Sequence, residues 1–124
     1  MKDHSQLREA VRKAIDPMSV MRRVTDEALV LVPAADGAVV ELLCDGHLCY
    51  VCASGSLVAH VGTRLDPVAS LSGYALRSQA TVLCEDSEED DRVDRAACRR
   101  VGAASMVCVP LVQRTEPIGV LKVT

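Results

Sequence analysis

The fold of this chain is decided by the stretch AVVELLCDGHLCYVCAS, residues 38–54. Two runs rich in β-branched and apolar side chains, 38–44 and 47–54, flank the dipeptide Asp45-Gly46. An Asp-Gly pair is preferred in two-residue hairpin turns, because both turn positions need positive φ angles. The sequence therefore predicts an antiparallel β-hairpin over this stretch.

Three cysteines in the hairpin have the spacing C-x4-C-x2-C, which is also a ligand spacing of plant-type ferredoxins. In a regular hairpin Cys44 pairs with His47, and Cys49 and Cys52 fall on opposite faces because side chains alternate along a strand. Such a hairpin separates the sulfur atoms that a tetrahedral metal site brings together. We therefore favour buried core cysteines over an iron–sulfur cluster, and a redox-sensing role for some thiols stays open.

The chain of 124 residues has the size of one domain that buries a core without cross-links. Its six cysteines follow a segment, residues 1–16, that is charged throughout and unlike a signal peptide, so we expect a cytoplasmic protein. The longest apolar runs, such as 28–35, are far shorter than the roughly 20 residues of a membrane span. A net charge of −3, no Trp, no Phe and two Tyr argue against nucleic-acid binding. We expect neither membrane nor nucleic acid as a partner.

Helical periodicity marks two segments before the hairpin. Asp16-Pro17 separates them, because Pro17 cannot donate to the preceding turn and Asp16 is a suitable N-cap for the next helix. Their apolar stripes exceed what one sheet face of this size needs, so we predict a homodimer through the N-terminal helix and the helical side of the sheet. The stripes consist of Leu7, Val11 and Ile15, then Met21, Val24, Ala28 and Leu31.

The second half of the chain alternates short elements. We expect a strand that carries His60, a helix over 70–79, a strand over 81–84, a helix over 85–102, and a hairpin formed by 104–112 and 118–124 around the turn RTEP. This order predicts the α+β class, with an antiparallel sheet covered by helices on both sides. Because the sequence stops inside the strand pattern GVLKVT, we expect the natural chain to continue.

The acidic stretch 85–91 has six acids in seven residues and raises the question of a divalent ion. Ser87 and Asp90 have the spacing of a capping box, and the other charges favour a helix N-terminus. A hard-ion site also needs ligands from a turn of fixed geometry. We therefore predict a helix start and no metal site.

The stretch LSGYALRSQATVLCEDSEEDDRVDRAACRRVGAASMVCVPLVQRTEPIGVLKV, residues 71–123, resembles the second half of a GAF domain. The features that carry the resemblance are a helix containing Gly73, a strand ending at Asp86, Gly102 and Ser105 before an apolar strand, Val109-Pro110-Leu111, and the run from Pro117 to Leu121. The hairpin at 37–55 agrees, so the resemblance covers roughly residues 18–124.

The resemblance implies a cytoplasmic sensory module of bacterial signalling proteins, with a six-stranded antiparallel sheet and a small-molecule pocket on the face away from the dimer. We expect a regulatory domain that binds a small ligand and controls a C-terminal effector such as a diguanylate cyclase, histidine kinase or phosphatase. Residues 1–16 would be an N-terminal helix for dimerisation and signalling, and residues 17–124 a GAF domain truncated at its C-terminal end. No catalytic residue and no resident cofactor is expected.

The best-known ligands of the resembled family fit this chain poorly. It has neither Asn nor Phe, so the motif of the cyclic-nucleotide-binding members is absent. Cys98 is followed by Arg99 and Arg100 instead of the histidine that commonly accompanies a covalent bilin. For His60, a core or sheet-edge position is favoured over haem ligation, because one histidine carries no spacing information.

One GAF-fold family is catalytic, namely the free methionine-(R)-sulfoxide reductases, which use cysteine thiolates. The cysteine expected next to the glycine of the middle helix is Ser72 here. Cys84, Cys98 and Cys108 remain as candidate thiols, so a thiol-based redox sensor or a reductase-like enzyme is the alternative interpretation.

The ligand site is expected between the sheet and the segment 57–91. With so few aromatic residues, the pocket should be small and aliphatic, and should admit a small organic acid more readily than a nucleotide base. Tyr74 is the most informative candidate, because its ring combines an apolar face with a hydroxyl. The candidate ligand-binding residues are His60, Tyr74, Asp86, Arg92, Ser105 and Cys108.

Overall fold

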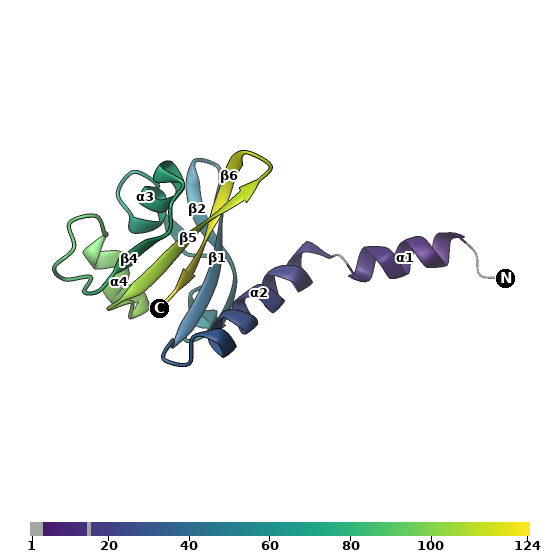
Figure 1. Ribbon diagram of the computed structural model, residues 1–124, viewed down its shortest axis with the longest axis horizontal. Coiled ribbons are helices and arrows are strands. Elements are labelled where there is room, and N and C mark those ends of the chain that lie inside the picture. Colours follow the sequence, from purple (N-terminus) through teal and green to yellow (C-terminus); the bar gives the residue numbers. More distant parts are fainter. Residues whose placement is uncertain (1–3, 15) are drawn as a thin grey trace.

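The computed structural model describes residues 4–14 and 16–124, and within these residues six antiparallel strands form one sheet (Figure 1). The strand order is β3-β2-β1-β6-β5-β4, so the first and last hairpins meet at the centre through β1 and β6. The predicted α+β class and six-stranded sheet are confirmed. The strands are β1 Gly37–Cys44, β2 His47–Gly55, β3 Arg64–Leu65, β4 Val82–Cys84, β5 Met106–Gln113 and β6 Glu116–Val123.

The β1–β2 hairpin forms around the predicted turn. Asp45 and Gly46 have φ angles of 50° and 77°, and Cys44 pairs with His47. The register shifts in the middle of the hairpin, since Val40 lies opposite Cys52 whereas the next residue of β1 lies opposite Tyr50. This β-bulge inserts one extra residue into β2.

The bulge corrects the prediction for the cysteines. Cys49 pairs with Leu42, and Cys52 pairs with Val40, two residues that share one face of β1. Cys49 and Cys52 therefore lie on the same face of the sheet, whereas an unbroken alternation would have placed them on opposite faces. Cys44 lies two residues after Leu42 on β1, so its side chain lies on the same face.

The β5–β6 hairpin closes at Arg114, which has a φ angle of 61°, and Thr115, so the second half of the predicted RTEP turn already belongs to β6. Gly119 is needed where β6 passes β1. A Cβ atom at this position would overlap the carbonyl oxygen of Glu41. The close approach of these central strands sets the geometry of the site described below.

One face of the sheet is covered by α2, Pro17–Leu31, which packs on β1 and β2. The predicted break is confirmed, since Asp16 caps α2 by accepting a hydrogen bond from the Ser19 backbone at 3.2 Å. Buried Thr25 contacts the hydroxyl of Ser54 on β2 at 2.7 Å. The preceding helix α1, His4–Ala14, extends away from the sheet (Figure 1). Ile15 of the predicted apolar stripe lies outside the described residues.

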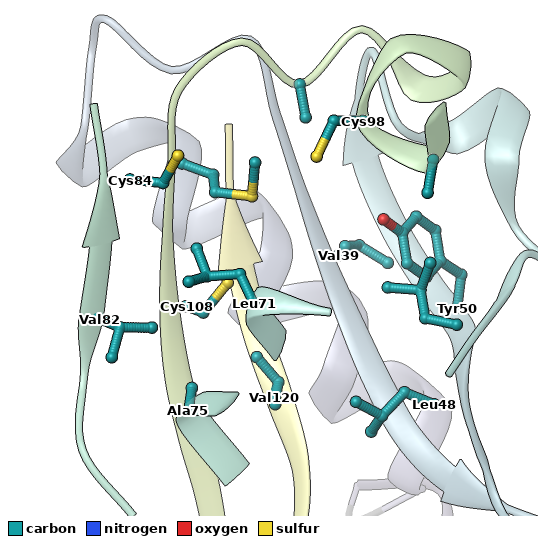
Figure 2. Packing of buried hydrophobic residues seen from close by; sticks show 14 of the residues in the cluster. Val39, Leu48, Tyr50, Leu71, Ala75, Val82, Cys84, Cys98, Cys108 and Val120 are labelled. Atoms are coloured by element: carbon teal, nitrogen blue, oxygen red, sulfur yellow. The ribbon is translucent and has the colours of Figure 1, made fainter. Parts of the chain in front are cut away.

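The opposite face is covered by α3, Leu71–Ser78, and α4, Arg95–Val101. These helices and the sheet enclose the larger core, which contains the sulfur atoms of Cys84, Cys98 and Cys108 (Figure 2). Helices therefore lie on both sides of the sheet, as predicted. Among the described residues, no helix has the length and apolar character needed to cross a membrane.

Two local predictions are wrong. His60 lies in the short 3-10 helix η1, Val58–His60, instead of on a strand. The acidic stretch does not begin a helix, because Asp86 and Asp90 each accept a backbone hydrogen bond two residues on and fold the chain into turns. The helix begins only at its N-cap Asp94, and it ends at Gly102 as predicted.

Candidate functional site

The core face of the sheet contains a buried ion pair. Glu41 on β1 and Lys122 on β6 point to this face, and their side chains are 0% and 6% exposed. Lys122 Nζ lies 3.3 Å from Glu41 Oε2. The pair is positioned by register, because Lys122 lies opposite Val39, two residues before Glu41 on the same face.

Two neighbours extend this pair toward α3 and β5. Ser72, at the start of α3, donates a hydrogen bond to Glu41 Oε2 at 2.9 Å. The same hydroxyl lies 3.8 Å from Cys108 Sγ. Among the described residues, Glu41 Oε1 has no hydrogen-bond partner although it is buried. An unpaired carboxylate oxygen in the core costs free energy, so it reduces the net contribution of this cluster to stability.

Tyr50 on β2 completes the cluster. Lys122 Nζ donates a hydrogen bond to the Tyr50 hydroxyl at 3.1 Å and lies 5.2 Å from the ring centroid. Both the hydroxyl oxygen and the ring face attract the ammonium group. Figure 2 shows the Tyr50 ring inside the core, on the same face as Val39 and Leu48.

A small cavity lies between this cluster and α4. Its volume is about 10 Å³, roughly the room that one water molecule needs. The polar groups at its surface come from Tyr50, Lys122, Ser70 and Asp94. The apolar part of its wall is formed by Leu65, Leu71, Val93, Ala97, Cys98, Val101, Ala103 and Met106.

Burial and charge act in opposite directions on the ion pair. Burial raises the pKa of Glu41, and Lys122 and Ser72 only partly oppose this shift. Burial alone would lower the pKa of Lys122, but the negative charge of Glu41 is the largest of the influences that oppose burial, and the pKa of Lys122 is raised. The ammonium group of Lys122 therefore stays protonated at neutral pH.

The thiols of this face are held in their protonated form. Burial raises the pKa of Cys108 to about 12 and that of Cys84 to about 11. Burial also raises the pKa of Cys98. A thiolate is the reactive form of cysteine, so these three thiols are poor nucleophiles in this structure. All six cysteines are free.

Of the residues proposed from the sequence, Cys108 belongs to the buried cluster. Tyr74 and Arg92 lie together elsewhere, with the guanidinium carbon 5.3 Å from the ring centroid, and Tyr74 is 40% exposed. Arg92 also bonds to both carboxylate oxygens of Asp90, at 3.0 and 2.7 Å. Hydrogen bonds from Arg92 hold the pKa of Asp90 below its usual range.

The other three candidates lie apart from these groups. His60 is half-buried on η1, whereas Asp86 and Ser105 are exposed, the former in a turn and the latter just before β5. Within residues 4–14 and 16–124, none of the three hydrogen-bonds to Tyr74, Arg92 or Cys108. The structure thus divides the proposed set into one core thiol, one surface pair and three separate residues.

The sequence did not identify four residues of the cluster as ligand-binding candidates, namely Glu41, Lys122, Tyr50 and Ser72. Glu41 interrupts the apolar run AVVELLC, and Lys122 interrupts IGVLKV. A charged residue within a strand that is otherwise apolar is the signal that could have indicated Glu41 and Lys122. Among the described residues, no group of three or more His, Cys, Asp or Glu side chains is placed to hold a metal ion.

Comparison with known proteins adds the following. A family model described as "GAF domain" matches residues 14–124. The second GAF domain of DevS from Mycobacterium smegmatis is 25% identical, with a TM-score of 0.68 over 88% of this chain and 73% of that chain. A GAF domain/HD domain protein from Geobacter sulfurreducens is 18% identical, with a TM-score of 0.76 over 90% of this chain and 76% of that chain.

An enzyme also has a similar fold. Type II free methionine-R-sulfoxide reductase from Thermoplasma acidophilum is 22% identical, with a TM-score of 0.71 over 86% of this chain and 72% of that chain. At this identity the likeness concerns the fold alone. No curated protein matches the sequence.

Proposed function

The chain belongs to the GAF domain family, and we propose that it is the regulatory sensor domain of a multidomain bacterial signalling protein. In this proposal it works in the cytoplasm as a homodimer. A small ligand binds on the face covered by α3 and α4, and its binding controls an effector domain that follows in the full-length protein.

The observation that carries the proposal is the buried cluster of Lys122, Glu41 and Tyr50, because two of its members also line a cavity. A buried ion pair is weak support for stability, since desolvation of both charges opposes their attraction. Titratable groups that converge at a concave, largely apolar site are typical of ligand binding. The cluster therefore fits a binding role better than a purely structural one.

The class of ligand can be inferred from the N–H donors of Lys122 that have no partner in the protein. A lysine ammonium group has three N–H donors, and within the described residues Lys122 Nζ has two partners, Glu41 and Tyr50. The third donor is free for an acceptor in the cavity, and a carboxylate is the acceptor that a buried cation favours most. A small organic acid is thus the ligand class that we infer, in agreement with the aliphatic wall.

Binding requires the site to open, because the cavity has room for about one water molecule. The element best placed to move is α4, which has seven residues and covers the cavity with Ala97, Cys98 and Val101. The segment before α4 consists of turns. Arg99 on α4 forms a surface ion pair at 2.6 Å with Glu88 in this segment. Displacement of α4 would couple an entering ligand to β4 and β5.

Thermal-shift screening tests the proposal. The panel contains acetate, lactate, succinate and glutarate, with cyclic AMP and cyclic GMP for comparison. A carboxylate at one hundred times its Kd should add about 2.7 kcal/mol of stability. The increase should disappear in Lys122→Met, decrease in the milder Tyr50→Phe, and persist in the exposed control Arg100→Gln. Stabilisation by cyclic nucleotides alone would contradict the proposal, and no response to any compound would leave dimerisation as the role of this domain.

The surface candidates from the sequence enter the same screen. Tyr74 and Arg92 would contact a ligand only if it reaches the rim of the opened site. His60, Asp86 and Ser105 do not line the cavity, and Ser105 lines a separate groove with Val32 and Leu83. Tyr74→Ala and Arg92→Ala should weaken the response to the active carboxylate if the rim takes part. An unchanged response in both variants would restrict the site to the buried cluster.

The thiol-enzyme alternative predicts a different result. Cys84, Cys98 and Cys108 would have to act as nucleophile and resolving thiol, yet their raised pKa values oppose thiolate formation. We therefore expect no turnover of free methionine-(R)-sulfoxide with a dithiol reductant. Turnover that is lost in Cys108→Ser would replace the sensor proposal with the enzyme.

A further inference from the structure

A second pair of thiols lies outside the core, at the end of the β1–β2 hairpin. Cys44 is exposed and Cys49 is half-buried. Cys44 pairs with His47 and Cys49 pairs with Leu42, so the two cysteines are diagonal neighbours on the α2 face of the sheet. The right-handed twist of a hairpin brings one of its two diagonals closer together.

The contacts indicate that this diagonal is the short one. Cys49 Sγ lies 3.8 Å from the carbonyl oxygen of Cys44. A hydrogen bond between the two thiols is the largest influence on the pKa of Cys44, and it raises that pKa. The left-handed turn residues Asp45 and Gly46 fix the two strands on either side of this contact.

The other cysteines are placed differently. Cys52 is buried and lies opposite Val40, on the far side of the bulge from Cys49. Cys84, Cys98 and Cys108 are buried under α3 and α4 on the opposite face. Only the pair Cys44 and Cys49, among the six cysteines, combines solvent access with a contacting partner.

We propose that Cys44 and Cys49 form an intramolecular disulfide when the protein meets a low-molecular-weight disulfide such as oxidised glutathione. The exposed Cys44 thiol loses its proton, and its thiolate attacks one sulfur of glutathione disulfide, which forms a mixed disulfide and releases one glutathione thiolate. Because the pKa of Cys44 is raised, this first step should become faster as the pH rises. Cys49 then loses its proton and attacks Cys44 Sγ, which releases the second glutathione. Two protein thiols become one disulfide, and their two electrons and two protons pass to glutathione disulfide as it becomes two glutathione molecules.

The cysteine spacing suits such a bond sterically. A disulfide needs Cα atoms within about 7 Å and converging Cβ atoms, and diagonal neighbours in a twisted hairpin approach this geometry. The bond would close a short loop around Asp45-Gly46 without changing the register. The proposal is independent of the ligand site, because it concerns the opposite face of β1.

Peptide mapping tests the proposal on the whole chain. The reduced protein is incubated with oxidised glutathione, alkylated, unfolded, and cleaved on the N-terminal side of aspartate. Cleavage before Asp45 places Cys44 in the peptide that starts at Asp36, and Cys49 in the peptide that starts at Asp45. The two peptides should stay joined until reductant is added, and the count of free thiols in the unfolded protein should fall from six to four.

Matched variants identify the partner within the second peptide, which also contains Cys52. Cys49→Ser should abolish the joined peptides and leave Cys44 as a mixed disulfide with glutathione, whereas Cys52→Ser should leave the joined peptides intact. The proposal is overturned if the joined peptides persist in Cys49→Ser, if Cys44 and Cys49 each carry glutathione without a bridge, or if the bridge links two protein molecules.

Discussion

Glu41 and Lys122 occupy inward-facing positions whose nearest inward neighbours on the same strands are Val39 and Val120. Valine at these positions would pack without desolvating a charge. The presence of two buried charges where valine would pack is therefore the residue-scale feature that most needs an explanation. We infer that the explanation is ligand binding.

The ion pair makes a prediction for stability. Lys122→Met should lower the free energy of unfolding by roughly 3 kcal/mol or more, because it leaves the Glu41 carboxylate buried without a counter-charge. The double variant Glu41→Leu/Lys122→Met should recover most of this loss, since no charge remains buried. Urea unfolding measures the wild type, Glu41→Leu, Lys122→Met and the double variant. If the double variant is as unstable as the sum of the two single variants, the charges contribute nothing as a pair.

Cys108 makes a prediction for pH dependence. Its pKa rises from 9.0 to about 12 on folding, so the folded protein binds a proton that the unfolded chain releases above pH 9. The contribution is complete below pH 9 and is lost between pH 9 and about 12 as pH rises, by about 1.4 kcal/mol per pH unit. Stability measured from pH 8 to pH 11 should fall less steeply in Cys108→Ala. If stability falls equally steeply with pH in both proteins, the Cys108 thiol ionises in the folded protein at the same pH as in the unfolded chain.

At the scale of elements, residues with strong local preferences made the hairpins and helix ends predictable. Asp45-Gly46, Asp16-Pro17 and Gly102 each occur where the structure bends or ends an element. The helix start predicted for the acidic stretch is wrong because aspartate side chains can cap turns as well as helices. Asp86 and Asp90 form turns here.

The bulge in β2 is a different case. No residue type marks it, because the extra residue is accommodated by the pairing of two strands whose register is set by the whole sheet. Without the bulge, Cys49 and Cys52 would lie on opposite faces. Which cysteines share a face was therefore not predictable from the alternation of side chains.

Gly119 makes a prediction for the central strands. Gly119→Ala should destabilise the protein by more than 1 kcal/mol, because the new methyl group overlaps the backbone of β1 at Glu41, and two paired strands cannot separate locally. Gly46→Ala is the control, since a Cβ there meets no atom within 4 Å and only the positive φ angle opposes it. Urea unfolding compares the two variants. A smaller loss in Gly119→Ala than in Gly46→Ala would contradict the close approach of β1 and β6.

For the whole molecule, the α2 side of the sheet is the surface that most resembles an interface. Leu31 on α2 is 72% exposed, and Leu7 and Val11 on α1 are exposed too. A groove of about 860 Å³ runs between α2 and the strands β5 and β6, with a largely apolar wall. Exposed apolar surface of this extent is typical of protein association.

The proposed dimer makes a prediction for assembly. Sedimentation of the whole chain should show a homodimer at micromolar concentration, because association would bury the apolar residues of α1 and α2. Removal of residues 1–16 should weaken the dimer without unfolding the domain, since α1 extends away from the sheet (Figure 1). A monomer at high micromolar concentration would contradict the proposed assembly, and an unfolded truncated protein would contradict the assigned domain division.

The candidate site was less predictable than the fold. Cys108 was identified from its position in the family pattern, and the predicted hairpin already places Glu41 opposite Tyr50. Lys122 and Ser72 join this pair only because β6 and α3, which are distant in the sequence, converge on the same face. That convergence depends on the strand order, in which β6 lies beside β1. Sequence spacing carries no information on it.

The central claim is that a small carboxylate binds beside Lys122, and methyl NMR of the methionines tests it most directly. Met106 lines the cavity, whereas Met18 and Met21 lie on α2 at the opposite face. In protein labelled with ¹³C at the methionine methyl groups, titration with the carboxylate that stabilises the domain best should shift the Met106 signal. The Met18 and Met21 signals should stay unchanged. A titration that shifts Met18 or Met21 and leaves Met106 in place would contradict the account.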